Sequence, residues 1–350
     1  MSDNLQLLKF NEIDLNDRFF DSLKADYEEF EDWFIRKGNS KAYIKYDDEN
    51  NIEGFLYFKM EHDTVDDITP SIEAKNVLKI GTFKINPHGT RLGERFIKKS
   101  LDYAIINNAS FCYVTVFGKQ TTLIKLFQNY GFLEYGVKET PNGKEIVLLK
   151  NLSKITGDVN IDYPLIKPEK RDKYVLSIYP QYHSIMFPDS ILRTEKMDIL
   201  TDVSYTNSIH KIYVCSMRDV NKLKYGDILI IYRTSPEPGQ AEYKSVVTSI
   251  CVVEEVREQN EFKDFNHFYK YASKYSVFDK RDLKYWYNKG GCTVIKMTYN
   301  IALTKKINRH KMIEELMFDR DIYWGFFKIT DEQFQNILIG GEVNEGFIID

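Results

Sequence analysis

The chain has 350 residues, with 29% charged residues and a net charge of −4, which is typical of a globular protein and long enough for two domains. It has no run of 18 apolar residues and no signal-peptide pattern at its start, so we expect a cytoplasmic protein without a membrane partner. Its six histidines and four cysteines are scattered, which predicts reduced thiols and no metal site. The cysteines are Cys112, Cys215, Cys251 and Cys292.

The first 152 residues alternate between strand and helix patterns, which predicts an α/β (α+β) domain with a central mixed sheet. The turn at 47–51 predicts that the strands on either side of it form a hairpin. The predicted strands are 7–10, 41–46, 54–60, 77–85, 111–117, 134–137 and 145–149, and the predicted helices are 16–27, 28–36, 92–105 and 122–129.

The chain is organised around a strand at 77–85, a turn that starts at Pro87, and a helix that begins near Leu92. A strand followed by a glycine-bearing loop and a helix start presents backbone N–H groups and the positive end of a helix dipole to an anion, usually a phosphate. Neither G-x-x-x-x-G-K-[ST] nor G-x-G-x-x-G is present, which excludes two common nucleotide-binding loops.

Two segments resemble signatures of the GNAT superfamily of acetyl-CoA-dependent N-acetyltransferases. His88 to Gly93 lies on the R/Q-x-x-G-x-G/A loop of that family, and Phe127 to Phe132 lies on its Tyr-x-x-x-Gly-Phe signature. His88 replaces the usual Arg or Gln, Arg91 replaces the middle glycine, and Phe127 replaces a Tyr that often protonates the leaving thiolate in this family. The resemblance implies an acetyl-CoA-binding fold over residues 1–152.

The resemblance also implies where acetyl-CoA and the reacting groups lie. Tyr130 either replaces Phe127 as the proton donor or packs beneath the turn at Gly131, and Glu61 and Glu73, with His62 beside Glu61, are either general bases or solvated loop charges. The residues that the resemblance assigns to the cofactor are Phe83, Ile85, Gly89, Thr90, Arg91, Leu92, Gly93, Glu94 and Gln120.

Residues 153–172 are rich in proline and charge without periodicity, which predicts a linker before a second domain at 173–350. That domain shows strands near 174–178, 211–215, 226–232, 246–256 and 292–297. Short strands joined by turns predict a small β-barrel. The order of its strands resembles the PUA-like barrels (the PUA, ASCH and EVE relatives), which implies an association with RNA or modified bases but assigns no binding residue here.

Residues 262–289 interleave basic and aromatic side chains. Lysine neutralises phosphate and aromatic rings stack on bases, so this segment is a candidate nucleic-acid surface that includes Lys280, Arg281, Lys284 and Trp286. The alternative is a pair of amphipathic helices that bury their aromatic rings and leave their lysines in solvent.

Three functions are compatible with the sequence. The first is an acetyltransferase whose acceptor amine is on RNA, tRNA or a nucleic-acid-bound partner, with a toxin as a variant of it. The second is an acetyltransferase for protein or small-molecule amines, in which the barrel shapes the cleft or makes an oligomer. The third is a binding protein that has kept the fold without the chemistry.

Overall fold

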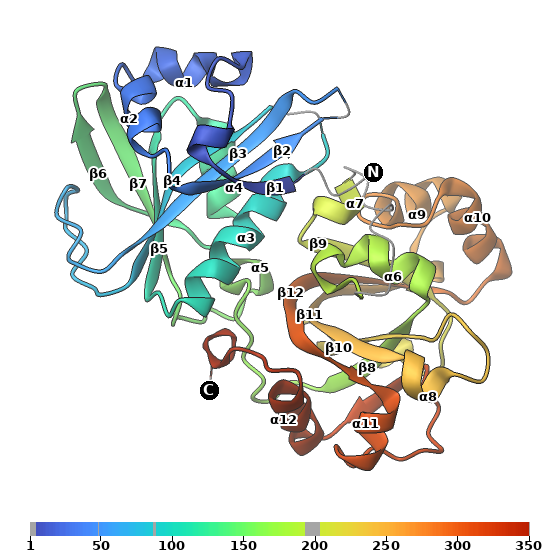
Figure 1. Cartoon of the computed structure of the whole chain (residues 1–350). Coiled ribbons are helices and arrows are strands. Elements are labelled where there is room, and N and C mark those ends of the chain that lie inside the picture. The colour runs from blue at the N-terminus through green and yellow to red at the C-terminus, as the bar shows by residue number, and fades with distance from the viewer. Residues whose placement is uncertain (1–4, 48, 87–88, 193–203, 350) are drawn as a thin grey trace. The chain divides into compact units, whose positions relative to one another are not determined.

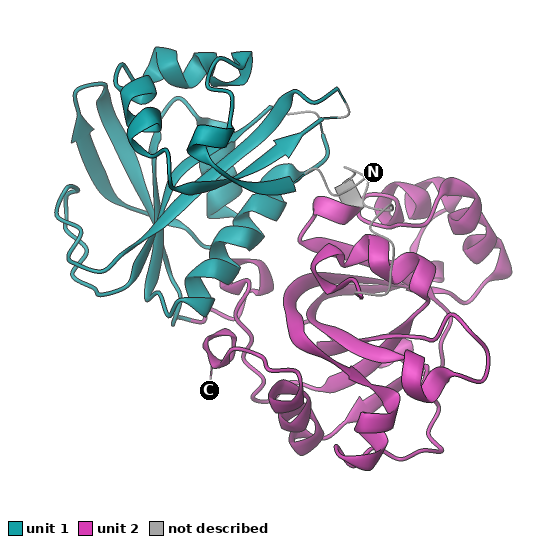
Figure 2. Cartoon of the chain, viewed as in Figure 1, with its two compact units in different colours: residues 1–154 teal, residues 155–350 magenta. Residues whose placement is uncertain are grey.

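The computed structural model describes residues 5–47, 49–86, 89–192 and 204–349, and it separates into two compact units, residues 1–154 and 155–350 (Figure 2). The first unit contains β1 (Leu5–Lys9), α1 (Asp21–Asp26), α2 (Phe30–Arg36), β2 (Lys41–Tyr46), β3 (Ile52–Glu61), β4 (Val77–Ile85), α3 (Leu92–Ile106), β5 (Phe111–Phe117), α4 (Thr121–Gln128), β6 (Leu133–Thr140) and β7 (Gly143–Asn151) (Figure 1). Each predicted strand and helix of this half is present.

The sheet of the first unit has the order β1-β2-β3-β4-β5-β7-β6. Its neighbouring strands are antiparallel except β4 and β5, which run parallel because α3 connects them. Aromatic packing holds α1 and α2 on one face, where Phe20 and Phe34 contact Phe55 of β3. On the other face α3 approaches β3 closely: a Cβ on Gly54 would lie 2.8 Å from Leu92.

The second unit is built on one mixed sheet with the order β13-β8-β10-β11-β12-β9, in which only β8 and β10 pair in parallel. Its elements are α5 (Val159–Asp162), β8 (Lys173–Ile178), α6 (Pro180–Met186), α7 (Ser204–Asn207), β9 (His210–Cys215), β10 (Ile228–Arg233), α8 (Ala241–Lys244), β11 (Val246–Glu258), α9 (Phe265–Ala272), α10 (Lys280–Lys289), β12 (Thr293–Asn308), α11 (Arg309–Glu314), β13 (Phe326–Ile329) and α12 (Asp331–Gly340).

The long strands β11 and β12 curve strongly (Figure 1), and their ladder shifts register at three places. Such irregularities bend a sheet toward closure. Among the described residues no ladder joins β9 to β13, so the sheet of this mostly-β unit is curved but open between these two edge strands. The sequence predicted β12 only as far as residue 297 and missed β13, because polar residues interrupt the apolar pattern at both places.

Residues 155–172 differ from the predicted linker. Tyr163, Leu165 and Ile166 are buried within the second unit, and the Tyr163 hydroxyl donates a hydrogen bond to the backbone carbonyl of Tyr299 at 3.0 Å. The composition predicted a linker because prolines and charged residues are frequent in this segment. The apolar residues between them are nevertheless part of the core. The structure therefore places this segment inside the second unit and corrects the linker at 153–172.

Candidate functional site

A bulge in β4 opens the centre of the first sheet. Tyr57 of β3 pairs with Thr82 while Phe58 pairs with Ile80, so Gly81 is an extra residue in β4. A bulge bends its strand, and the parallel pairing of β4 with β5 ends where the bulge begins, at Ile80 and Val114. Beyond that point, no described residue pairs with the edge of β4 that faces β5.

Gly81 is needed at this bulge because the ring of Tyr57 packs on its backbone. A Cβ on Gly81 would lie 2.9 Å from a ring carbon of Tyr57, which is too close for any other residue without a shift. The glycine therefore allows the bend in β4 and the placement of Tyr57 at the same time.

A cavity of about 300 Å³ lies at this opening, on the face of the sheet that α1 and α2 cover. Its floor consists of strand residues, and the rest of its lining consists of residues from α1, α2, the segment between them and the start of α4. The strand residues are Tyr57, Lys59, Lys79, Ile80, Gly81, Thr82, Phe83, Val114, Thr115, Val116, Lys138, Thr140 and Glu145, and the others are Leu23, Tyr27, Glu29, Phe30, Trp33, Lys37, Gln120 and Leu123.

Hydrogen bonds connect the segment between α1 and α2 to the β6–β7 hairpin at one side of this cavity. The Tyr27 hydroxyl donates to the Glu145 carboxylate at 2.6 Å, and the Asn142 amide donates to Glu29 at 2.8 Å. Glu145 is buried, with 3% of its surface exposed. Burial and the bond to Glu145 raise the pKa of Tyr27 far above its ordinary value, so Tyr27 stays a hydrogen-bond donor.

Two lysines that line the cavity share one carboxylate, and one of them, Lys138, lies opposite Glu145 in the β6–β7 ladder. Lys138 forms a short ion pair with Asp67, and the Lys79 ammonium lies 3.6 Å from the same carboxylate oxygen. Burial, together with the charge of Lys138, lowers the pKa of Lys79. Burial acts to raise the pKa of Asp67, but the hydrogen bond from Lys138 and the charge of Lys79 outweigh it and keep the pKa below its usual range.

The residues expected to hold the cofactor lie along β4 and at the start of α3. Phe83 lines the cavity and packs edge-on against Phe96 and Phe127, with ring centroids 5.6 and 5.1 Å apart. Ile85 ends β4, and Leu92, Gly93 and Glu94 begin α3. Gln120 precedes α4 and lines the cavity.

The described part of the loop before α3 contains Gly89 and Thr90. Gly89 has a φ of 86°, in the left-handed region that favours glycine, and a Cβ there would meet no atom within 4 Å. Thr90 is half-buried, and Arg91 has a φ of 60° and pairs with Glu94 at 2.9 Å. The first amides of α3 point out of the helix end, which suits an anion. His88 lies outside the described residues.

None of the three residues predicted to take part in catalysis lines this cavity. Tyr130 is buried behind α4, and its backbone carbonyl accepts a hydrogen bond from Lys150 at 2.8 Å. Glu61 accepts from the Tyr113 hydroxyl at 2.6 Å and pairs with Lys59 at 2.8 Å. Glu73 is exposed in the loop before β4.

Sequence reasoning identified Gln120 but missed four other polar residues that line the cavity: Tyr27, Lys79, Lys138 and Glu145. Tyr27 and Glu145 are 118 positions apart, so no local motif connects them. The one available signal was a charged residue within an apolar strand, as at Lys79 and Glu145.

In the second unit, residues 262–289 form the two helices α9 and α10, and most of their aromatic rings are packed. Phe268, Tyr275 and Phe278 are buried in the core, and Trp286 packs against it. Lys280, Arg281 and Lys284 are exposed on α10, and Lys280 also lies over the ring of Tyr269 at 5.4 Å. Of the side chains proposed for nucleic acid, the cations are accessible, whereas Trp286 is partly covered.

Two further cavities lie in the second unit, and neither contains a reactive set of side chains. Asp162 lines the first, of about 350 Å³, but accepts three hydrogen bonds from Thr156 and Gly157. Cys292 lines the second, of about 560 Å³, and burial raises the pKa of its thiol to about 11, so the unreactive thiol form dominates.

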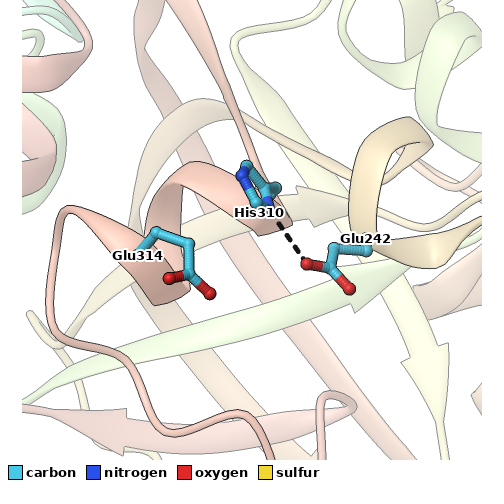
Figure 3. Close-up of side chains that lie close together, drawn as sticks. All are labelled: Glu242, His310 and Glu314. Atoms are coloured by element: carbon cyan, nitrogen blue, oxygen red, sulfur yellow. Dashed lines mark hydrogen bonds and ion pairs between the residues drawn. The ribbon is translucent and has the colours of Figure 1, made fainter.

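Three potential metal ligands, Glu242, His310 and Glu314, also come together in the second unit (Figure 3). Their ligand atoms lie within 4.8 Å of one another, and His310 bonds to Glu242 at 2.8 Å. Arg320 donates to both carboxylates, at 2.8 and 2.7 Å, so an arginine already supplies the positive charge there.

Within the described ranges, no helix has both the length and the apolar character needed to cross a membrane.

No protein-family model and no curated protein matches the sequence. Among solved structures, ASCH from Zymomonas mobilis is similar at 11% identity over 48% of this chain and 94% of that chain, with a TM-score of 0.33. Naa20 from Chaetomium thermophilum, crystallised with a bisubstrate analogue, is similar at 17% identity over 42% and 86%, with a TM-score of 0.32. Ard1 from Thermoplasma volcanium is similar at 12% identity over 42% and 97%, with a TM-score of 0.31.

The strand order of each unit defines its fold. The first unit has the predicted α/β architecture: a central mixed sheet, a parallel pair that opens at a bulge, and a glycine-bearing loop that leads into α3. The second unit is mostly β, as expected from its short strands.

Proposed function

We propose that the first unit transfers an acetyl group from acetyl-CoA to a primary amine. The observation that carries this proposal is the position of the cavity. It lies where the edge of β4 is left unpaired by β5, on the strand that leads to the loop at Gly89 and the start of α3. The extended arm of a thioester cofactor can pair with an unpaired strand edge, and its diphosphate can bind at the start of a helix. Acetyl-CoA needs both features next to each other.

The chain offers matching contacts for each part of acetyl-CoA. The open edge of β4 from Thr82 to Ile85 would bond the pantetheine arm, and the amides between Gly89 and Gly93 would hold the diphosphate. Bound acetyl-CoA supplies the acetyl group as a thioester, whose C–S bond breaks as the amide C–N bond forms. Backbone N–H groups at the bulge would stabilise negative charge on the acyl oxygen.

Glu145 is the group that we propose accepts the proton from the acceptor amine. It is a carboxylate on the cavity wall, and the hydroxyl of Tyr27 holds it in place. A general base must lie within hydrogen-bond reach of the proton it removes, and Glu61, Glu73 and Tyr130 do not line the cavity. Phe127 is buried against Phe83, so the leaving thiolate would take its proton from solvent.

A binding measurement tests this function directly. Calorimetry of the full chain should show one site for coenzyme A, and Thr90→Asp should weaken binding at least about tenfold because it places a negative charge beside the diphosphate. Gln128→Glu adds the same charge on the exposed surface of α4 and should leave the affinity unchanged. Absence of coenzyme A binding to the native chain would refute the proposal.

The finer hypothesis, that the acceptor amine is on RNA guided by the second unit, has weaker support. Lys280, Arg281 and Lys284 are exposed, but most nearby aromatic rings are packed and cannot stack on bases. Reversing these three cations to Glu should reduce affinity for single-stranded RNA and flatten its salt dependence. The matched control reverses Lys170, Lys305 and Lys328, which are also exposed. Equal binding by both triple variants would remove α10 as a nucleic-acid surface.

A further inference from the structure

The charges around the first unit's cavity are separated into a positive side and a negative side. Lys79 and Lys138 lie on the positive side with the single carboxylate of Asp67 between them. Their side chains are only 15% and 20% exposed, so water screens them weakly. One carboxylate cannot balance two ammonium groups, and this side keeps an excess positive charge directed at the cavity.

The other lysine on the strand floor does not add to this excess. Lys59 pairs with Glu61 at 2.8 Å, and that pair is neutral as a whole. Lys37 also lines the cavity, where its ammonium group lies over the ring of Tyr57 at 5.6 Å. Lys79 and Lys138 are the two lysines of the strand floor that share one carboxylate.

The negative side lies next to the positive one. Glu145 is opposite Lys138 in the antiparallel pair of β6 and β7. Side chains in such a pair have Cβ atoms about 5 Å apart. A molecule that contacts both sides thus needs a cationic group and an anionic group only a few bonds apart.

The remaining wall is aromatic. Phe30 and Trp33 from α2 and Tyr57 from β3 line the cavity, which at about 300 Å³ is at the lower end of the range for small-molecule sites. The size of the cavity, its aromatic surface and its neighbouring charges of opposite sign together suit a small zwitterion with an apolar group.

We propose that the acceptor is a free α-amino acid with an apolar side chain. Its carboxylate binds Lys79 and Lys138, its ammonium group binds Glu145, and its side chain packs on Trp33. This inference rests on the proposed acetyl transfer. Glu145 takes one ammonium proton, and the nitrogen lone pair forms the new amide bond to the acetyl carbon as the C–S bond breaks. The nitrogen then releases its second proton to solvent, and the coenzyme A thiolate takes a proton from solvent and leaves as a thiol.

Binding without acetyl-CoA separates this inference from the transfer reaction. Titration of phenylalanine or leucine, followed by calorimetry and by the fluorescence of Trp33, should show at least about tenfold tighter binding than titration of the corresponding methyl ester, because the ester lacks the carboxylate. The other two tryptophans, Trp286 and Trp324, lie in the second unit, and Trp33→Phe should remove the fluorescence change.

Variants then assign the preference to the two lysines. Lys79→Gln and Lys138→Gln should each weaken binding of the amino acid at least about fivefold and leave binding of the ester nearly unchanged. Asp67→Asn should strengthen binding of the amino acid, because it releases both lysines. Lys144→Gln removes the same charge at an exposed position of β7 and is the matched control.

The outcomes distinguish the two proposals. Equal affinity for acid and ester, equal effects of the lysine variants on both, or transfer to aminoacyl-RNA but not to amino acids would overturn the amino-acid inference while leaving the acetyl transfer intact. Selective binding of amino acids to a chain that does not bind coenzyme A would overturn the acetyl transfer instead. Because Asp67→Asn is expected to strengthen binding, misfolding of a lysine variant cannot imitate the whole pattern.

Discussion

Two groups of hydrogen-bonded polar side chains, one in each unit, differ in whether they line a cavity. In the first unit, Tyr27 and Glu145 form a hydrogen-bonded pair that faces a cavity. In the second unit, a chain of hydrogen bonds runs from His183 through Thr248, Ser249 and Ser190 to Tyr299, and every member is at most 1% exposed. None of these five residues lines either of the two cavities described in that unit.

The contrast separates a reactive arrangement from a structural one. A fully packed chain of hydrogen bonds fixes the positions of the segments that contribute its members. A carboxylate at a cavity has one side held by the protein and another open to a ligand. We therefore expect substitutions in the first group to alter turnover and substitutions in the second group to alter stability.

The largest expected effect is on turnover. Glu145→Gln keeps the shape of the side chain but cannot accept the amine proton, so kcat/KM for acetyl transfer should fall at least about 100-fold. The affinity for coenzyme A should remain that of the wild type, because Glu145 is on the acceptor side of the cavity. Thiol release from acetyl-CoA, measured with a panel of amines, checks the first result and calorimetry the second.

Tyr27→Phe provides a graded comparison with that variant. It removes one hydrogen bond to a charged group and leaves the carboxylate in place, so the expected fall in kcat/KM is about tenfold. If Glu145→Gln and Tyr27→Phe both retain wild-type turnover, the carboxylate of Glu145 is not the general base. The polar group of the first unit would then be as purely structural as that of the second unit.

The next effect in size is on stability in acid. Burial, with the charges of Arg233 and Lys306 adding to it, lowers the pKa of His183 from 6.5 to about 3. The unfolded chain takes up a proton below about pH 6.5, whereas the folded chain does so only near pH 3. The free energy of unfolding should therefore decrease as the pH falls through this window, by up to about 1.4 kcal/mol per pH unit from this group.

His183→Gln isolates that contribution, because it removes the titrating group and keeps a polar side chain. Urea unfolding between pH 7 and pH 4, followed by Trp286 and Trp324 in a Trp33→Phe background, should give a flatter pH dependence for the variant than for the parent. If the free energy of unfolding has the same pH dependence in parent and variant, His183 takes up its proton in the folded state as readily as in the unfolded state. The hydrogen-bonded chain that contains His183 would then be open to solvent.

The sequence predicted the first unit well because its information is local. Alternating apolar residues marked β4, and a proline, two glycines and a periodic apolar run marked the loop and α3. The positions of the cofactor residues follow from that one stretch. They stay a prediction until coenzyme A binding is measured.

The residues of the acceptor side could not be predicted in the same way. Tyr27 meets Glu145 only because the segment after α1 crosses over the β6–β7 hairpin, and Lys79 meets Lys138 through a loop carboxylate on Asp67. Such contacts depend on the order of strands in the sheet, which a single sequence does not specify. In α9 and α10 the local pattern was visible but fitted two interpretations, a nucleic-acid surface or a pair of amphipathic helices. Only the packing of the aromatic residues distinguishes them.

The smallest expected effect concerns the surface group in Figure 3, which extends the comparison to charges that are neither buried nor at a cavity. Arg320 bridges Glu242 and Glu314, and its side chain is 49% exposed. Solvent and salt screen ion pairs of this kind, so Arg320→Ala should shift the thermal midpoint only slightly, and the difference should vanish in about 1 M salt.

A large shift that persists in salt would show that this group acts as a structural unit, as the His183 chain does. If Zn²⁺ raises the midpoint of the variant but not of the parent, Arg320 occupies the place that a metal ion would take beside His310.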